Sequence, residues 1–474
     1  MENGKQQKIH CEMRTDLNLL LECLKYQMDH PVSQKEALVT IYSTCQHNSN
    51  ATDYFQEIGG LLFVYNLAKS STYSMVKEAA LFTLGGLAEN NVFCQQMLCT
   101  SGLFEELHMF LTNKDSSVNL KRMSVYVLLV LVSNNKSGQT HVRESGCLDV
   151  LLQLFRTIIS VSEENLLDKN INQYHLWSSV CSALCACVNN PQNEDNQKTC
   201  SLIFPHAKDW LQSSIKSEIV RPICSFIGLT VANNSKIQYF FVSIGGLAVL
   251  DKLLVKLTHN SFGNNSDTKL AVVVTKTMDA CIADNPAIGV SLPKYNIVPN
   301  LLSLLSNNFL DSGEQFSIIL TLGHCTESCE ENQYTFIKNN GLAVMIQALT
   351  ESQDEELHKA ATFVLQNCRK ISCQTIGLSL NSRNFSKILQ TCRYLCEQHR
   401  IILETEMEYK RKLKGIITGN TSLNYNGNLQ MKQDVYPKKQ TIKKKYIIKG
   451  QDQNGKHSFK DEVLPPKIAN SVFG

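Results

Sequence analysis

A recurring pattern of helix, paired asparagines, short helix and glycine turn constrains the fold of this chain more than any other feature. It is clearest at residues 231–257, VANNSKIQYFFVSIGGLAVLDKLLVKL. Asn233-Asn234 is expected to close the preceding helix, because Asn tolerates the left-handed conformation at a helix C-terminus. Gly245-Gly246 is expected to form a close turn that a side chain would obstruct. One such unit cannot bury its own apolar faces, so the pattern predicts stacked repeats.

The pattern recurs along the first 370 residues at intervals of 43 to 55 residues. The asparagines expected to end a helix are Asn48, Asn91, Asn135, Asn190, Asn234, Asn285 and Asn332. Glycine turns are expected at Gly59-Gly60, Gly102, Gly146, Gly245-Gly246 and Gly341. A period of about 40–47 residues with two or three helices is that of armadillo and HEAT solenoids. The turn between a short and a longer helix favours armadillo.

The predicted architecture is all-α. Residues 1–372 are expected to form an armadillo/HEAT-like right-handed superhelical solenoid of seven full repeats and a partial amino-terminal one, with loop insertions at 160–175 and 258–269. Residues 373–384 are a polar linker. Residues 385–414 carry apolar residues in successive heptads, which predicts an amphipathic helix that docks on a partner. Residues 415–474 predict a disordered tail with the basic core KKQTIKKKYIIK.

Charge is unevenly distributed along the chain. From residue 410 onward there are 14 Lys and Arg against 4 Asp and Glu, which gives this end a net charge of +10. Because the whole chain carries +3, residues 1–409 carry −7. The tail is interpreted as a solvated, nuclear-targeting segment, because the only aromatic residues in or directly before its basic core are Tyr436 and Tyr446. DNA, RNA or an anionic membrane are the other partners that such a tail fits.

The cellular compartment follows from the cysteines and the amino terminus. The 18 Cys lie singly within apolar helices, which indicates a reducing compartment, the cytosol or the nucleus. The amino terminus lacks the pattern of a signal peptide, and no run of about 18 apolar residues predicts a membrane span.

No catalytic motif is found: the phosphate-binding loop, the dinucleotide fingerprint, the nucleophile elbow and HExxH are all missing. We therefore predict no enzyme, no catalytic residue and no cofactor. The one metal-like group is Cys392, Cys396 and His399, on one helical face at i, i+4 and i+7. A fourth ligand is missing nearby, so these residues are interpreted as part of the partner-facing stripe. A zinc ion shared across a partner interface is the alternative.

Paired asparagines on an acidic body suggest a second function, an armadillo adaptor that binds basic peptide cargo. Nuclear-import adaptors of this fold hold such a peptide with Trp four residues before Asn. This chain has only Trp177 and Trp210, and Cys181 stands where that pattern would place Asn. Helix capping is therefore the favoured role of the asparagines.

Several segments closely resemble the amino-terminal armadillo region of the meiotic telomere repeats-binding bouquet formation family. Among them are MVKEAALFTLGGLAENNVFCQQ, NLKRMSVYVLLVLVSNN, RPICSFIGLTVANN and SIILTLGHCTESCEENQY. The resemblance runs nearly continuously over residues 1–370. A second block, LNSRNFSKILQTCRYLCEQHR, is similar to a segment far downstream in the family. The chain thus looks like a shortened form that lacks the long middle region.

The resemblance implies a non-enzymatic scaffold in the nucleus, at telomeres on the inner nuclear membrane in meiotic prophase. It implies roles in chromosome movement, homologue pairing and synapsis. The implied partners are a bouquet-formation partner protein, through it a membrane-anchored junction protein, and also a SUN-domain envelope protein and meiotic cohesin. The family's docking segment for the bouquet partner corresponds to Phe385, Ile388, Leu389, Cys392, Leu395, Cys396, His399 and Ile402.

Two features of the family are missing from this sequence. No Trp follows Trp210, so the Myb-like DNA-binding module with its spaced tryptophans is not expected. The LTPRRR-type motif that binds the shelterin telomere-repeat-binding factor is also missing. Direct telomeric DNA binding and shelterin recruitment are therefore not expected of this chain.

Overall fold

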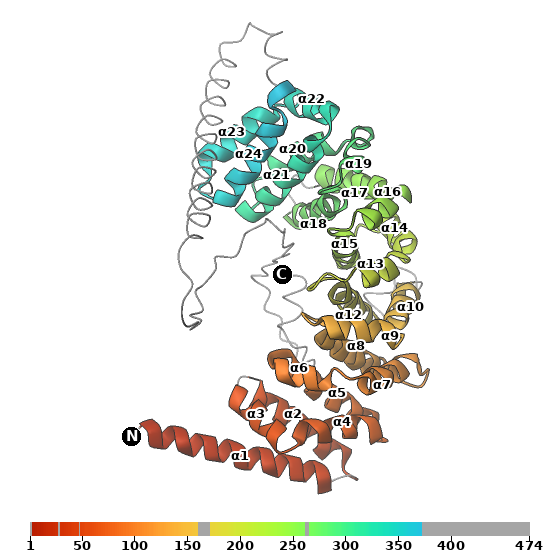
Figure 1. The fold of residues 1–474 in the computed structure, drawn as a ribbon, viewed down its shortest axis with the longest axis vertical. Helices are drawn as coiled ribbons and strands as arrows, with labels where there is room; N and C mark the ends of the chain where they lie inside the picture. Colours follow the sequence, from red (N-terminus) through yellow and green to blue (C-terminus); the bar gives the residue numbers. More distant parts are fainter. Residues whose placement is uncertain (1, 27–28, 47, 160–170, 261–264, 372–474) are drawn as a thin grey trace, which may run out of the picture. The chain divides into compact units, whose positions relative to one another are not determined.

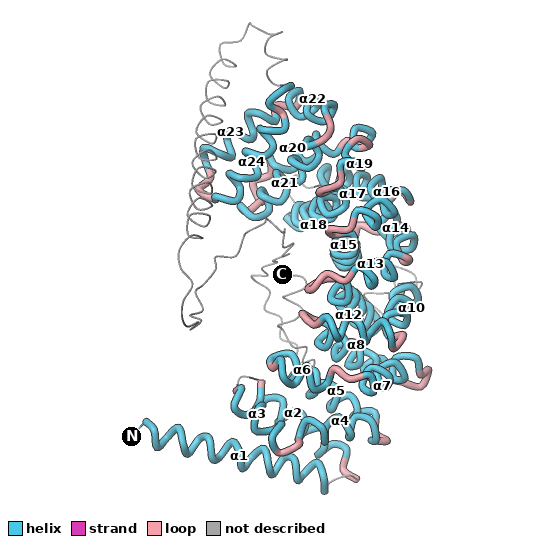
Figure 2. The backbone as a smooth tube through the Cα atoms, in the orientation of Figure 1, coloured by secondary structure: helices cyan, strands magenta, loops and turns pink. Residues whose placement is uncertain are grey.

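The structure is a computed structural model that describes residues 2–26, 29–46, 48–159, 171–260 and 265–371. Every regular element within these residues is a helix, and none of them forms a strand (Figures 1 and 2). The prediction of an all-α fold is confirmed. The predicted linker, docking helix and tail lie outside the described residues.

Seven consecutive three-helix units occupy the described residues between 49 and 367, which is the predicted number of full repeats. The first helices are α3 (Ser49–Glu57), α6 (Val92–Leu98), α9 (Lys136–Glu144), α13 (Glu194–Ser201), α16 (Ser235–Ser243), α19 (Pro286–Gly289) and α22 (Glu330–Lys338). The second helices are α4 (Gly60–Ser70), α7 (Ser101–Thr112), α10 (Cys147–Ile159), α14 (Phe204–Ser213), α17 (Gly246–Asn260), α20 (Ile297–Leu305) and α23 (Gly341–Glu351).

The third helices are the longest in most repeats and hold much of the core. They are α5 (Ser74–Asn90), α8 (Val118–Val132), α12 (Ile171–Val188), α15 (Ser217–Val231), α18 (Asn265–Ile282), α21 (Ser312–Glu327) and α24 (Glu355–Asn367). In repeat 6 a short 3-10 helix, η1 (Leu292–Lys294), follows the single turn of α19. Parts of both predicted loop insertions are helical, because α12 begins at Ile171 and α18 begins at Asn265.

Two helices precede the repeats, α1 (Glu2–Tyr26) and α2 (Pro31–Cys45). α1 packs against α2 and α3 through Leu17, Leu21 and Leu24, all of which are buried. The end unit of a solenoid has no neighbour on one side, so it needs a helix with one polar face to cover its core. α1 and α2 therefore form the predicted partial repeat.

The described residues divide into two compact units, one ending at Asp284 and the other beginning at Asn285. In the first unit the chain of third helices is continuous: α2 packs on α5, α5 on α8, α8 on α12, α12 on α15 and α15 on α18. In the second unit α21 packs on α24. Leu120 and every residue from Arg122 to Val132 in α8 are buried, because this helix has neighbours on both sides.

The turn between the first and second helices has the predicted glycine geometry. Gly245 has a φ of +83°, and a Cβ on Gly246 would lie 2.4 Å from the Phe241 ring. The same arrangement recurs at Gly59-Gly60 with Phe55 and at Asn340-Gly341 with Phe336. The first position of the pair therefore needs a left-handed conformation, and the second needs the space of a missing side chain.

Four asparagines predicted to end a helix are instead the N-cap of the next one: Asn48, Asn135, Asn234 and Asn285. Two further predicted positions lie inside a helix. Gly102 lies inside α7, whose first turn is capped by the Thr100 hydroxyl instead. Asn332 lies inside α22, and the sulfur of Cys329 caps that helix. Both errors arose because the residue type matched the pattern while a neighbour took the role.

The asparagine pairs divide their work between two helices. Asn134, Asn190 and Asn233 take the left-handed conformation after a third helix, as predicted for Asn233. The second asparagine begins the next helix: the side chain of Asn234 accepts a hydrogen bond from the Ile237 amide, and that of Asn91 from the Cys94 amide. Capping is thus the observed role of these pairs.

Candidate protein-interaction surface

Four glutamines on first helices hydrogen-bond to the end of the third helix and so join the first and last helices of their repeat. They follow the residue that caps the helix by four positions, and we call them the closing glutamines: Gln95, Gln139, Gln197 and Gln238. Each side-chain amide donates to backbone carbonyls at the end of the third helix of the same repeat, in its last turn or in the residues that follow it. Gln95 reaches Val130 O at 2.7 Å and Ser133 O at 2.9 Å.

The other three repeat this geometry. Gln238 donates to Ala280 O at 2.9 Å and Ala283 O at 3.0 Å. Gln197 donates to Ala232 O at 3.0 Å, and Gln139 donates to Ala186 O at 2.9 Å and Pro191 O at 2.9 Å. The last carbonyls of a helix have no partner within the helix, so these amides satisfy groups that would otherwise be buried without one. This role was not predicted from the sequence, although the spacing of Gln after Asn recurs.

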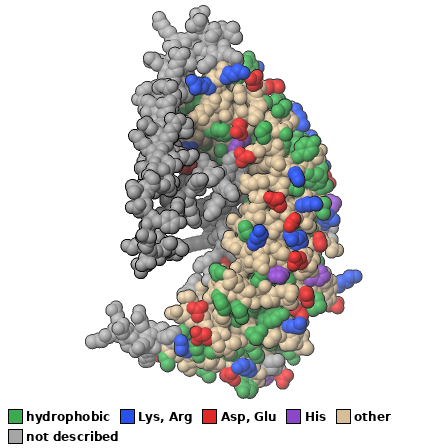
Figure 3. All heavy atoms as spheres, viewed as in Figure 1, with side chains coloured by type: hydrophobic (Ala, Val, Ile, Leu, Met, Phe, Trp, Pro, Cys, Tyr) green, Lys and Arg blue, Asp and Glu red, His purple; other side chains and the backbone are tan. Residues whose placement is uncertain are grey.

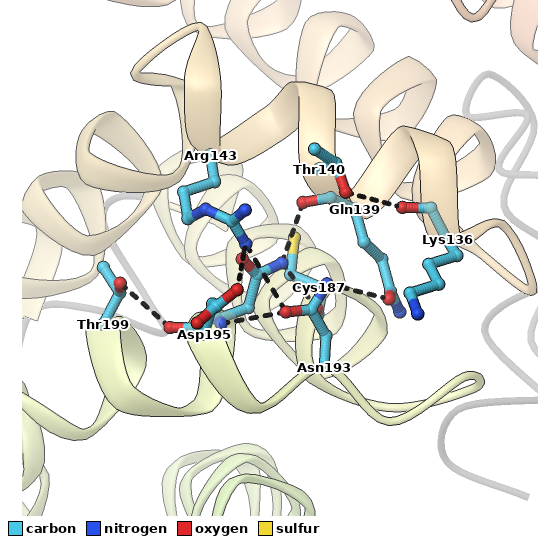
Figure 4. Close-up of polar contacts among 9 residues, drawn as sticks. Lys136, Gln139, Thr140, Arg143, Cys187, Asn193, Asp195 and Thr199 are labelled. Carbon is cyan, nitrogen blue, oxygen red and sulfur yellow. Dashed lines mark hydrogen bonds and ion pairs between the residues drawn. The ribbon is translucent and has the colours of Figure 1, made fainter.

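Repeats 3 and 4 are also joined by a polar network between α9 and α13 (Figure 4). Arg143 donates to Asn196 Oδ1 at 2.9 Å and pairs with Asp195 at 3.6 Å. Asn196 Nδ2 in turn donates to Gln139 O at 2.9 Å and Cys187 O at 2.8 Å. Because Asn196 and Gln139 are fully buried, the network fixes the position of one first helix on the next.

One side of the third helices in repeats 1 to 4 carries residues in a common register. The register is counted from the asparagine at the C-terminal end of each third helix, Asn90, Asn134, Asn190 or Asn233. The positions twelve and eight residues before that asparagine lie one helical turn apart. We call this side the third-helix face. Its residues are Glu78 and Phe82 on α5, Arg122 and Tyr126 on α8, Ser178 and Ser182 on α12, and Arg221 and Ser225 on α15.

Aromatic rings and glycines bring α2, α5 and α8 close together along this face. The Tyr42 and Phe82 rings are 4.6 Å apart and those of Phe82 and Tyr126 are 6.3 Å apart. A Cβ on Gly85 would lie 2.4 Å from the Tyr126 ring, and one on Gly86 would lie 2.3 Å from the Tyr42 ring, so the two glycines leave room for the rings. The helices pack closely here because α5 contributes no side chain at these positions.

Two carboxylates lie along the α5–α8 contact. The Tyr126 hydroxyl donates to Glu89 Oε2 at 2.7 Å. Burial, reinforced by the Glu89 charge, raises the pKa of Tyr126 far above its ordinary value, so this phenol stays protonated. Glu78 accepts hydrogen bonds from Ser74, Ser117 and Asn119.

Most cysteines of the described residues pack as core side chains, although Cys11 is exposed and Cys23 and Cys99 are half-buried. Cys181, Cys185, Cys325 and Cys329 are buried, which confirms the prediction that they act as small apolar residues. Burial raises the pKa of Cys185 to about 12, so its thiol is protonated and unreactive near neutral pH. Among the described residues no group of His, Cys, Asp or Glu is arranged to hold a metal ion. The candidates Cys392, Cys396 and His399 lie outside them.

Trp177 differs from the groove tryptophans of import adaptors. It is only 1% exposed and its ring lies between those of Phe155 and Tyr174, at 6.0 Å and 6.2 Å. A ring covered in this way presents no surface to a peptide. Within the described part of the chain, no helix combines the length and the apolar character needed to cross a membrane.

The docking residues expected from the sequence cannot be located. Phe385, Ile388, Leu389, Cys392, Leu395, Cys396, His399 and Ile402 all lie outside the described residues. Their role in binding a partner stays a prediction.

The three-helix repeats, the stacked third helices and the turns between them define an armadillo-type solenoid. Solved structures are consistent with this class. An engineered protein matches with a TM-score of 0.59 and 18% identity, covering 74% of this chain and 78% of that one. A chain from a structure concerned with the phosphorylation switch that controls the interaction between cadherin and beta-catenin matches with a TM-score of 0.55 and 14% identity, covering 74% and 69%. At these identities the likeness shows the fold alone.

Sequence comparison identifies the family. The chain is 67% identical over 377 residues to telomere repeats-binding bouquet formation protein 1 of Homo sapiens, covering 79% of this chain and 52% of that protein. It is 61% identical over 389 residues to the Mus musculus protein of the same name, covering 82% and 50%. The chain belongs to the telomere repeats-binding bouquet formation protein 1 family, and it spans about half the length of these relatives. A family profile described as the SIL1/FES1/HPBP1 C-terminal domain also matches residues 50–165.

Proposed function

We propose that this chain is a non-catalytic, nuclear protein-binding scaffold that acts at telomeres during meiotic bouquet formation. The observation that carries the proposal is the 67% identity over 377 residues to a relative named for telomere-repeat binding and bouquet formation. A solenoid supports the same conclusion, because stacked repeats expose long surfaces that suit the binding of other proteins.

The finer role follows from the family resemblance. The scaffold helps to attach telomeres to the inner nuclear membrane for chromosome movement, homologue pairing and synapsis. It binds the bouquet-formation partner through residues 385–402 and, through that partner, the membrane-anchored junction protein. The SUN-domain envelope protein and meiotic cohesin are its further partners.

Coexpression of the tagged chain with the bouquet-formation partner tests the docking assignment. The apolar stripe is expected to be buried on binding, so an Ile388→Asp, Leu395→Asp double variant places two charges in the interface and should abolish copurification. Asp substitutions at Ser386 and Gln390, polar positions that lie between the stripe residues in sequence, serve as the control and should copurify like the parent. Copurification of the double variant at the parent level would show that the partner binds elsewhere.

A further inference from the structure

We propose that the third-helix face of repeats 2 to 4 is a docking site for an acidic, extended polypeptide segment, anchored by Arg122 and Arg221. Two observations support the proposal. The two arginines occupy equivalent positions in two repeats, and neither forms a hydrogen bond or an ion pair with another described residue. The site would belong to the scaffold proposed above. Its test uses no telomere component, so the two proposals can fail separately.

Arg122 is the stronger of the two anchors. It is only 9% exposed, and its Nε is buried with no hydrogen-bond partner among the described residues. Within the same part of the chain no carboxylate forms an ion pair with it, although Glu78 and Glu89 lie on the adjacent helix α5. A buried guanidinium nitrogen without a partner costs free energy, and such an atom needs a reason to be there.

Arg221 occupies the equivalent place two repeats later. It precedes Asn233 by twelve residues, as Arg122 precedes Asn134, and on α12 Ser178 precedes Asn190 by the same number. Arg221 is half-buried and forms no hydrogen bond or ion pair within the described part of the chain. Glu218 is exposed one turn earlier on α15 and does not form an ion pair with Arg221.

The spacing of the two arginines fits an extended chain. Neighbouring helices pack about 8–10 Å apart, so two intervals, from α8 through α12 to α15, separate the anchors by about 16–20 Å. An extended polypeptide advances about 3.3 Å per residue, so acidic side chains about five or six residues apart would reach both. Between them the half-buried Ser178 offers a hydroxyl to the segment's backbone. The hydroxyl of Ser182, which is buried, donates to Ser178 O.

An acidic polypeptide fits this face better than the other charged partners. The carboxylates nearest the anchors are already engaged, Glu89 by Tyr126 and Glu78 by Ser74, Ser117 and Asn119. The unpaired charge on the face is therefore positive, which disfavours basic cargo. A nucleic acid needs a broad exposed basic surface, whereas the only cations among the eight residues of this face are Arg122, which is buried, and Arg221, which is half-buried. On the side of the molecule that Figure 3 displays, acidic and basic side chains are interspersed.

Fluorescence anisotropy on the full chain tests the site. The probes are two labelled twelve-residue Gly/Ser peptides, each with two Glu residues, placed either six or two positions apart. We expect the parent chain to bind the six-residue spacing more tightly. The Arg122→Met, Arg221→Met double variant should lose at least tenfold in affinity for that peptide, because both charge-assisted pairs with its Glu residues are removed. The control Arg156→Met, an exposed cation on the second helix α10, should bind like the parent.

Thermal unfolding separates a binding role of Arg122 from a structural one, because loss of a structural contact would lower the Tm. Removing an unpaired buried charge should leave the Tm of Arg122→Met unchanged or raise it. The proposal is overturned if the double variant binds as well as the parent, if both spacings or neither bind the parent, or if Arg122→Met lowers the Tm. Tighter, arginine-dependent binding of a twenty-base-pair duplex would make the site a nucleic-acid site and overturn it as well.

Discussion

Repeats 2 to 5 and repeat 6 satisfy the same backbone carbonyls in different ways. In repeats 2 to 5 the closing glutamine of the first helix donates to the end of the third helix in the same repeat. In repeat 6 the first helix has a single turn and Gly289 at the equivalent position. The carbonyls at the end of α21 accept instead from Asn332, Gln333 and Asn367, all in repeat 7.

The difference shows where each repeat obtains its stability. In a repeat with a closing glutamine, that side chain satisfies carbonyls at the end of the repeat's own third helix, and in repeat 3 Asn196 of repeat 4 adds a bond to Cys187 O. Repeat 6 depends on the repeat that follows it. Both Trp177 and Trp210, the only tryptophans of the chain, lie in the first unit, so tryptophan fluorescence reports on that unit while far-ultraviolet circular dichroism reports on both.

The largest expected effect is a loss of stability of the first unit at alkaline pH. Burial raises the thiol pKa of Cys45, Cys185 and Cys224 from 9.0 to about 12 and that of Cys147 to about 11. The unfolded thiols lose their protons first, so stability is unchanged below pH 9 and falls between pH 9 and 12. Each thiol contributes up to about 1.4 kcal/mol per pH unit.

Urea unfolding followed by tryptophan fluorescence at pH 8 and pH 10.5 measures this loss. Cys185→Ala serves as the matched variant and should show a smaller difference between the two pH values. If the midpoint is the same at both, the thiols are not held protonated by burial.

The next effect comes from the closing glutamines. Gln95→Leu leaves Val130 O and Ser133 O without their side-chain donor, which should destabilise the first unit by about 1–3 kcal/mol. Gln96→Leu changes the neighbouring exposed glutamine of the same helix and is the control. In chemical denaturation the midpoint of Gln95→Leu should be clearly lower than that of Gln96→Leu. Equal midpoints would show that Gln95 does not stabilise the repeat.

The sequence predicted more of the fold than of the side-chain network that closes each repeat. Paired asparagines and glycines such as Asn233-Asn234 and Gly245-Gly246 marked the repeats because their backbone conformations restrict residue type. Gln139 was missed, because a glutamine within a short polar helix looks the same whether it faces solvent or a neighbouring carbonyl. Arg122 was missed for the same reason, since sequence alone does not show whether a cation has a partner.

The glycine turns should have the same effect on stability in the two units, in contrast to the closing glutamines. Gly246→Ala brings a Cβ to 2.4 Å from the Phe241 ring, and Gly341→Ala does the same at Phe336. Each should destabilise its own unit by about 1–3 kcal/mol through overpacking. Phe241→Leu added to Gly246→Ala should recover part of the loss.

Fluorescence and circular dichroism melts separate the two glycine variants. Gly246→Ala should shift the fluorescence transition, whereas Gly341→Ala should shift only the dichroism transition. A fluorescence shift of equal size in both would indicate that the units unfold together.

The smallest effect is expected from a single helix cap. Asn234→Ala removes the acceptor for the Ile237 amide and should cost about 1 kcal/mol. Asn234→Ser keeps an acceptor and should retain most of the stability. Equal losses in the two variants would show that another role of Asn234, such as its bond to Gln197, dominates.

Hydrogen–deuterium exchange of the full-length Gln95→Leu variant tests most directly the claim that repeats 2 to 5 are each closed by their own glutamine. If Gln95 closes repeat 2, we expect faster exchange in α8, extending to its neighbours α5 and α12, while α21 and α24 exchange at the parent rate. Faster exchange of similar size in all of these helices, or no change in α8, would contradict it.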